Sequence, residues 1–404
     1  MSSNSALQER TVKVLATAQV LNGVGVAGTV AAGSLLVASI TNSETLSGLA
    51  QTSSVLGAAA LALPLARLTG RGGRRLALST GLIAGAIGSL LAILGGSDKN
   101  IYLMLTGTFL VGAASAAGYQ ARFAAIDLAN EKRAKQLSFV VWGSTIGAVT
   151  GPNLMEPAGN LAESLDLPRL TGPYLISALT LGLAALVIQL FLRPDPYLTA
   201  AKDSGASSLP RIKTKVALRH IRSNPKTLFA IAAIAIGHIA MVAVMVMTPV
   251  HMAHVDVTLT IIGLVISVHV LGMYAISPLV GALTDHLGRL RVIQIGVVTL
   301  LSSALISGLA RAGDAIALGI GLFLLGLGWS CTLIAGSALL TESVEPELRS
   351  ASQGASDLVM NLSGAAGGAV AGVIIASLSY GWLCLLAAIP VAILGIWSLK
   401  IKAR

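Results

Sequence analysis

A series of long apolar runs repeats along nearly the whole chain and limits the folds open to it. Each run has roughly the 20 residues that a helix needs to cross a bilayer. Only 11% of the residues are charged, whereas a soluble domain carries about 25%. The pattern predicts an all-α polytopic membrane protein with twelve transmembrane helices, at about 12–39, 46–68, 75–96, 100–127, 134–157, 170–193, 225–252, 258–283, 290–311, 315–341, 349–377 and 380–399.

The basic residues predict the orientation of these spans. With both termini on the cytoplasmic side, only Lys99, Arg169 and Arg311 of the 27 Lys and Arg residues fall on external loops. Positive residues collect on cytoplasmic loops, so we expect both termini inside. The first ten residues lack the order of a cleavable signal peptide, so we expect the first span to be an uncleaved anchor.

The sequence disfavours several other classes of protein. The net charge of +10 comes from cytoplasmic segments, and the basic run at 211–226 joins two halves, so we expect no nucleic-acid partner. GxSxG, P-loop and HExxH motifs are absent from the sequence, so we expect neither an enzyme nor an ATP-driven pump, and no prosthetic group. Cys331 and Cys384 both fall within expected spans, where a disulfide is not expected.

The sequence divides into two similar halves, each with six expected spans. We expect an amino-terminal bundle at 1–193, a cytoplasmic linker at 194–224 and a carboxy-terminal bundle at 225–404. Glycine- and arginine-rich turns occur at equivalent places, 66–75 and 281–291, and glycines recur at every fourth position in the fifth and eleventh spans. Such stripes let neighbouring helices approach closely.

Methionine and histidine are concentrated in the first two spans of the second half. Met241 and Met245 stand at i and i+4, as do His269 and Met273, so each pair projects from one helical face at mid-membrane depth. Thioether and imidazole ligands favour Cu(I), and no acidic residue lies beside them. The pattern indicates a path for copper as the transported substrate.

Further residues are candidates for supporting roles. His238 could be an auxiliary ligand or contact a neighbouring helix, and His251, Met252 and His254 could capture the ion at the outer mouth. Arg122 and Asp127, five residues apart, could form a polar contact that orders the cytoplasmic gate. Intramembrane acids are costly and often functional, which makes Asp357, and then Glu156, candidates for proton coupling.

The duplication and its signatures resemble the major facilitator superfamily. The resemblance rests on the turn with Gly281, Asp285, His286, Gly288 and Arg289, and on the glycine span that ends at Pro152. It implies alternating access about a site near the bilayer midplane, with Asp285 and Arg289 in the gate. In the first half Gly70 stands where the family usually has aspartate, so the corresponding charge contact is not expected there.

Within that superfamily, the MxxxM and HxxxM pair resembles the CcoA-type copper transporters. The resemblance implies copper import across the bacterial cytoplasmic (inner) membrane, with Met241, Met245, His269 and Met273 on the metal path and a cytoplasmic copper acceptor downstream. That subgroup is also associated with additional functional cysteines, and this chain has only two. We expect it to act as a monomer in the lipid bilayer.

The sequence leaves a second cargo class open. Related facilitators carry organic solutes such as riboflavin or a drug, and Tyr119, Phe123, Trp142 and Tyr274 could build a small stacking surface for one, although aromatics are only 4% of the chain. A metal sensor or assembly factor would usually need a soluble domain, which is not expected here.

Overall fold

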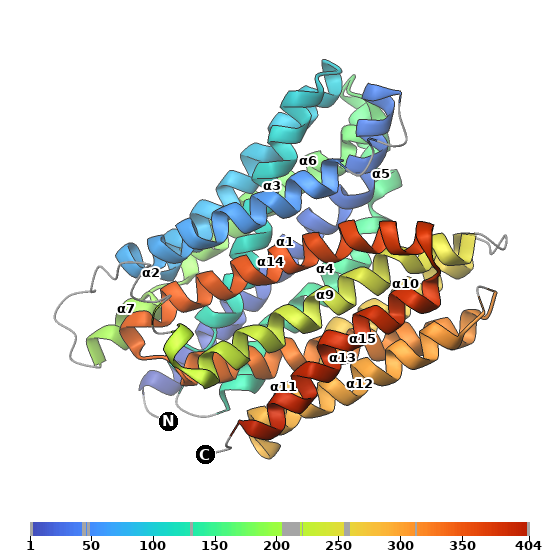
Figure 1. Ribbon diagram of the computed structural model, residues 1–404. Coiled ribbons are helices and arrows are strands. Elements are labelled where there is room, and N and C mark those ends of the chain that lie inside the picture. The colour runs from blue at the N-terminus through green and yellow to red at the C-terminus, as the bar shows by residue number, and fades with distance from the viewer. Residues whose placement is uncertain are drawn as a thin grey trace. The chain divides into compact units, whose positions relative to one another are not determined.

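Helices form all the regular secondary structure of the computed structural model within the residues it describes, 3–42, 46, 49–129, 132–203, 219, 221–253, 259–311 and 313–401 (Figure 1). In chain order they are α1 (Ser3–Thr41), α2 (Leu49–Ser97), α3 (Ile101–Ala124), α4 (Arg133–Asn153), α5 (Met155–Ser164), η2 (Arg169–Thr171), α6 (Gly172–Phe191), α7 (Pro196–Asp203), α9 (Pro225–Ala253), α10 (Leu259–Val270), η3 (Leu271–Ala275), α11 (Ser277–Leu287), α12 (Arg289–Leu309), α13 (Ala315–Glu342), α14 (Pro346–Ser377) and α15 (Tyr380–Lys400).

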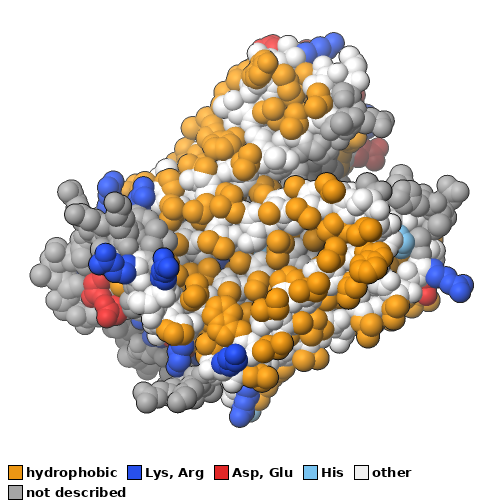
Figure 2. Space-filling view, in the orientation of Figure 1, with side chains coloured by type: hydrophobic (Ala, Val, Ile, Leu, Met, Phe, Trp, Pro, Cys, Tyr) orange, Lys and Arg blue, Asp and Glu red, His pale blue; other side chains and the backbone are white. Residues whose placement is uncertain are grey.

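The all-α, multi-span prediction is confirmed. Each expected span coincides with one of these helices, with a part of α2, or with the broken helix α10–η3–α11. Within the described chain, nine helices are long and apolar enough to cross a membrane, and a bent pair adds a tenth. Figure 2 shows hydrophobic side chains over the long sides of the helices and most Lys and Arg side chains towards their ends, as a lipid environment requires.

Three of the expected spans differ from their expected form. The second and third spans, expected with a turn between them, are joined in α2, where Gly73 alone leaves helical geometry at φ 85°. A positive φ of this kind suits glycine, which has no Cβ to clash with the backbone. The fifth span ends at Asn153, and a separate helix begins at Met155, so the expected end at 157 was too late.

The chain divides into two compact units, which are described separately below. Unit 1 comprises 1–130, 143–214 and 346–358, and unit 2 comprises 131–142, 215–345 and 359–404. The start of α14 therefore belongs with the helices of the first half, and the start of α4 with those of the second half. These two helices each contribute to both units.

Unit 1 is built on a very close pair of helices, α2 and α3. A Cβ placed on Gly57 would lie 1.9 Å from the carbonyl oxygen of Phe109, and one on Gly112 would lie 2.1 Å from the carbonyl oxygen of Ser54. The two helix backbones are thus in direct contact. Small residues allow this approach, which supplies packing energy where lipid removes the hydrophobic driving force.

Replacing Gly57 with alanine should lower the free energy of unfolding by about 1–3 kcal/mol, because the added methyl group has to push the α3 backbone away. Thermal unfolding in detergent measures the change. Gly182→Ala on α6 is the matched control, since its Cβ would meet nothing within 4 Å. Equal stability of the two variants would contradict the close α2–α3 contact.

Unit 2 is organised around α13, which packs against α9, α10, η3, α11 and α12. Between α10 and α11 the chain forms the π-helix η3, and the segments Leu264–Ala275 and Ser277–Leu287 meet at an angle of 41°. A Cβ on Gly326 of α13 would lie 2.4 Å from the carbonyl oxygen of His269 and 2.8 Å from the backbone nitrogen of Met273. The π-helix therefore overlaps the HxxxM motif at Leu271–Met273, and the bend follows it after Ala275. π-Helical turns are frequent at functional sites.

Candidate transport site

The four predicted copper ligands lie in the interior of unit 2 or at its edge. Met241 on α9, His269 at the end of α10 and Met273 in η3 are all buried, whereas Met245 is half-buried. Helix α9 and the α10–η3 segment, which carry these residues, do not pack extensively on each other; each packs against α13 instead. The structure thus shows the two motifs as separate neighbours of α13.

His269 has one ring nitrogen bonded and the other unbonded. The side chain is 0% exposed, and Nδ1 lies 2.8 Å from the carbonyl oxygen of Leu322 on α13. A carbonyl oxygen only accepts, so Nδ1 must carry the proton, and a neutral ring then has its lone pair on Nε2. Among the residues that the structure describes, Nε2 has no hydrogen-bond partner. A buried orphan acceptor of this kind is costly unless something binds it.

His238 is held by a neighbouring helix, which is one of the two roles expected for it. Its Nδ1 accepts a hydrogen bond of 3.0 Å from Nε1 of Trp329 on α13, and the edge with Nε2 faces Gly364 of α14, where an added Cβ would lie 2.7 Å away. With Nδ1 accepting, a neutral His238 carries its proton on Nε2. This arrangement favours a packing role over metal binding in the present conformation.

Trp329 is a residue that the sequence reasoning missed. It is buried, and it donates a hydrogen bond to His238, which lies three residues before Met241. Its ring also packs edge-on against Tyr274, the residue after Met273, with ring centroids 5.6 Å apart. One indole thus touches both motif-bearing segments. A tryptophan at mid-span was a signal that the sequence contained, but only the fold identifies its neighbours.

The residues expected at the outer mouth have different environments. His251 stacks on Tyr380 of α15 with ring centroids 4.3 Å apart, and Tyr380 shares a hydrogen bond of 2.8 Å with Thr248. Met252 is fully buried, and His254 lies outside the described residues. His251 and Met252 thus show packing contacts, and their capture role stays a prediction.

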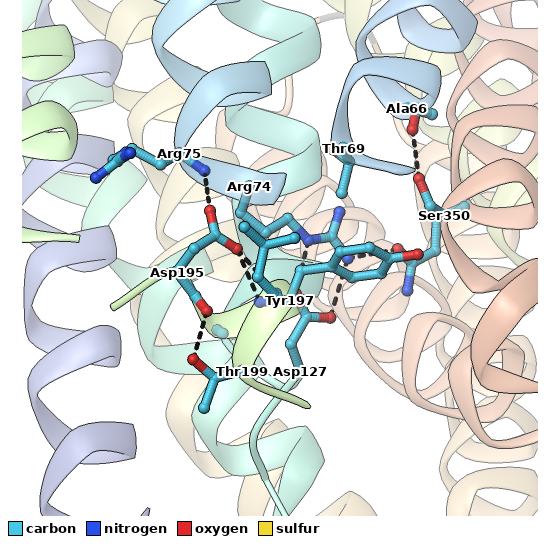
Figure 3. A network of polar contacts seen from close by, with 12 residues as sticks. Ala66, Thr69, Arg74, Arg75, Asp127, Asp195, Tyr197, Thr199 and Ser350 are labelled. Carbon is cyan, nitrogen blue, oxygen red and sulfur yellow. Dashed lines mark hydrogen bonds and ion pairs between the residues drawn. The ribbon is translucent and has the colours of Figure 1, made fainter. Parts of the chain in front are cut away.

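A polar network joins α2, the turn after α3 and the start of α14 in unit 1 (Figure 3). Arg74 donates to both carboxylate oxygens of Asp127, at 2.7 and 3.0 Å, and to the amide oxygen of Gln353 at 2.7 Å. Ser350 donates to the carbonyl oxygen of Ala66. Although Gly70 carries no carboxylate, this middle part of α2 is bound to α14 through the neutral polar side chains of Gln353 and Ser350.

The expected contact between Arg122 and Asp127 was wrong. Asp127 pairs with Arg74, and Arg122 pairs with Asp357, whose Oδ1 lies 2.6 Å from Nη2. Five residues along a helix turn the side chains about 140° apart at 3.6 residues per turn, and Asp127 also lies beyond the end of α3. Each charge therefore meets a partner from another helix.

In unit 2, the glycine- and arginine-rich turn at 281–291 likewise forms polar contacts with another helix. The carboxylate of Asp285 accepts from the backbone N–H groups of Ala134 and Lys135, at 3.1 and 2.8 Å, and thus caps the start of α4. Arg289 lies 3.2 Å from Asp285 and 2.8 Å from Glu342. Glu156, the other acidic candidate, is exposed in the first turn of α5.

Among the described residues, no three His, Cys, Asp or Glu side chains cluster as a metal site. The candidate site consists of methionines and histidine alone, with soft and neutral donors.

Comparisons with known proteins agree with this architecture. The sequence model described as Major Facilitator Superfamily matches residues 15–257 and 239–404. The uncharacterized MFS-type transporter YdeG of Bacillus subtilis is 37% identical, over 97% of this chain and 93% of its own. The riboflavin transporter RfnT of Brucella anthropi is 27% identical, over 89% and 87%. The crystal structure of an E. coli fucose:proton symporter, FucP, superimposes with a TM-score of 0.75 at 17% identity, over 97% and 98%.

Proposed function

Since the chain belongs to the Major Facilitator Superfamily, we propose that it is a secondary transporter that imports copper by alternating access. The cargo would pass Met241, Met245, His269 and Met273, and both termini would lie on the cytoplasmic side of a bacterial inner membrane. In this proposal the protein works as a monomer, without a prosthetic group, and delivers copper to a cytoplasmic acceptor.

The observation that carries the proposal is the state of His269. Histidine ligands of metals almost always donate the other ring N–H to a carbonyl or carboxylate, which fixes the ring and its tautomer. Nδ1 of His269 meets the carbonyl of Leu322 in this way, and Nε2 has no partner among the described residues. The ring is thus prepared to give a lone pair to a soft cation.

Neutral ligands also suit transport rather than storage. A carrier has to bind its ion well enough to take it up and weakly enough to let it go. Thioether sulfur and neutral imidazole bind without an anionic charge, so release does not require separating opposite charges. Met273 lies in the π-helix beside a 41° bend, where a small change of backbone would shift the sulfur relative to His269.

The resemblance to a riboflavin transporter supports a second cargo, an organic solute. Of the aromatic residues expected to form a stacking surface, Tyr119 and Phe123 lie against Arg122, and Tyr274 packs on Trp329. Trp142 is 40% exposed. These rings are engaged with protein neighbours or dispersed, so the observations favour the metal.

Uptake by the purified protein in liposomes separates the two cargoes. Cu(I) kept reduced, Zn²⁺ and riboflavin are offered separately and in competition. We expect accumulation of copper alone, no inhibition by riboflavin and weak inhibition by Zn²⁺. Riboflavin uptake that copper does not affect would overturn the copper proposal in favour of the second cargo.

A further inference from the structure

A groove of about 580 Å³ lies between helices α12 and α15 of unit 2. Both helices are long and apolar enough to cross the membrane. Of the residues that line the groove, Leu305, Leu309 and Leu385 are 63%, 78% and 53% exposed. Apolar side chains exposed on a membrane span face the hydrocarbon, so the groove opens to lipid. Its volume is within the roughly 300–1,000 Å³ of ordinary ligand sites.

Glycine and alanine residues make this hollow between the two helices. A Cβ on Gly381 of α15 would lie 2.9 Å from the carbonyl oxygen of Gly308 on α12, so the two backbones touch there. Ala304 and Ala388 also line the groove, and their short side chains leave the space beside the larger ones open. The hollow is therefore set by a backbone contact and by residues without movable side chains.

The two ends of the groove differ in chemistry. Leu301 of α12 lines the deeper end, whereas Ser379 and Trp382, at the start of α15, line the end near the membrane surface, where tryptophan is favoured. Arg311 is exposed and follows Leu309, the last lining residue of α12, by two positions. The stretch from Leu301 to Leu309 covers about 12 Å of helix axis. One leaflet of a bilayer has a similar depth of hydrocarbon, about 15 Å.

We propose that this groove binds one phospholipid molecule, with an acyl chain between α12 and α15 and the phosphate beside Arg311. The chain matches the apolar lining, and a phosphate complements a guanidinium in charge and hydrogen bonding. The acid nearest in sequence, Asp314, is engaged elsewhere, since its carboxylate accepts from the backbone N–H of Ala317 at 3.0 Å and caps α13. With both termini on the cytoplasmic side, the lipid comes from the external leaflet. The inference depends on the membrane-spanning fold and not on the cargo.

Native mass spectrometry of the full chain in detergent tests the site. The probe is dioleoylphosphatidylglycerol, added to protein that has been stripped of lipid. Wild type should hold a single tightly bound molecule, and Ala304→Phe and Ala388→Phe, whose rings fill the groove, should hold none. Gly319→Phe on α13 is the matched control and should bind as wild type, since it lies outside the groove and its Cβ would meet nothing within 4 Å. Binding by both filled variants, or none by wild type, would overturn the proposal.

Variants of Arg311 test the contact with the phosphate. Arg311→Gln should weaken binding of the probe by about fivefold, the effect of removing one basic residue near a membrane surface. Arg311→Lys should retain the affinity. Lys99→Gln is the control, because Lys99 is another exposed basic residue expected on the external side. Equal affinity of Arg311→Gln and wild type would contradict the assigned position of the phosphate.

Thermal unfolding gives a second readout for the groove. A ligand that binds only the folded protein raises the unfolding temperature in proportion to the logarithm of its concentration. The probe should stabilise wild type and Gly319→Phe in this way, but not Ala304→Phe or Ala388→Phe. A wild-type dimer that the two filled variants convert to a monomer would show instead that a second copy of the chain covers the groove, and would overturn the lipid proposal.

Discussion

Replacing His269 with alanine should lower copper uptake by about 100-fold or more, because changes even to the partners of a metal ligand cost 10–100-fold. His269 would contribute its Nε2 lone pair, and among the described residues no group of three or more His, Cys, Asp or Glu side chains offers another metal site. Radiolabelled copper accumulation by cells, with equal amounts of protein in the membrane, measures the effect. Uptake at the wild-type rate would exclude His269 from the path.

Methionine-to-leucine substitutions separate lost ligation from lost packing. Leucine nearly conserves the volume of methionine and usually costs less than about 1.5 kcal/mol of stability, but it has no sulfur. Met241→Leu and Met273→Leu should therefore fold and transport copper poorly. The controls are Met104→Leu and Met360→Leu, whose side chains are equally buried but lie outside the two motifs. If all four variants lost uptake alike, packing rather than thioether ligation would be the cause.

The membrane architecture could be predicted from sequence because lipid imposes a local rule. Every backbone group in the bilayer must be satisfied within its own helix, so each span is a continuous apolar run and can be found without knowing its neighbours. The breaks in the helices could not be predicted in this way, because they lie at contacts between helices that are distant in sequence. The π-turn at Met273 lies closely against Gly326 of α13, and no pattern within residues 258–283 encodes that contact.

The partners of the buried charges could not be predicted either, because they come from helices that are distant in sequence. Arg122 and Asp357 are 235 residues apart in sequence, whereas the acid nearest to Arg122 along the chain is Asp127. Gln353 carries no charge, so the sequence alone does not mark it, yet its amide oxygen accepts a hydrogen bond from Arg74. Single residues could be identified as costly in a membrane, whereas their pairing depends on which helices pack together.

Removing either partner of the Arg74–Asp127 pair should lower the free energy of unfolding by about 3–5 kcal/mol, because it leaves an uncompensated buried charge. The guanidinium is 1% exposed and the carboxylate 5%, and two hydrogen bonds join them. Arg74→Leu and Asp127→Leu are the single variants. In the double variant neither charge of the pair remains, so much of the lost stability should return. Unfolding in detergent, analysed as a double-mutant cycle, measures the coupling.

The chain offers an exposed ion pair as the control for this cycle. Lys13 and Glu9 are 2.7 Å apart on α1, as close as Arg74 and Asp127, but their side chains are 75% and 57% exposed. Water and salt screen such a pair, so its removal should leave the unfolding transition unchanged. If both cycles gave the same coupling, distance alone would set the energy. A large coupling only for Arg74 and Asp127 would mean that burial, which removes the screening by water, makes this contact strong.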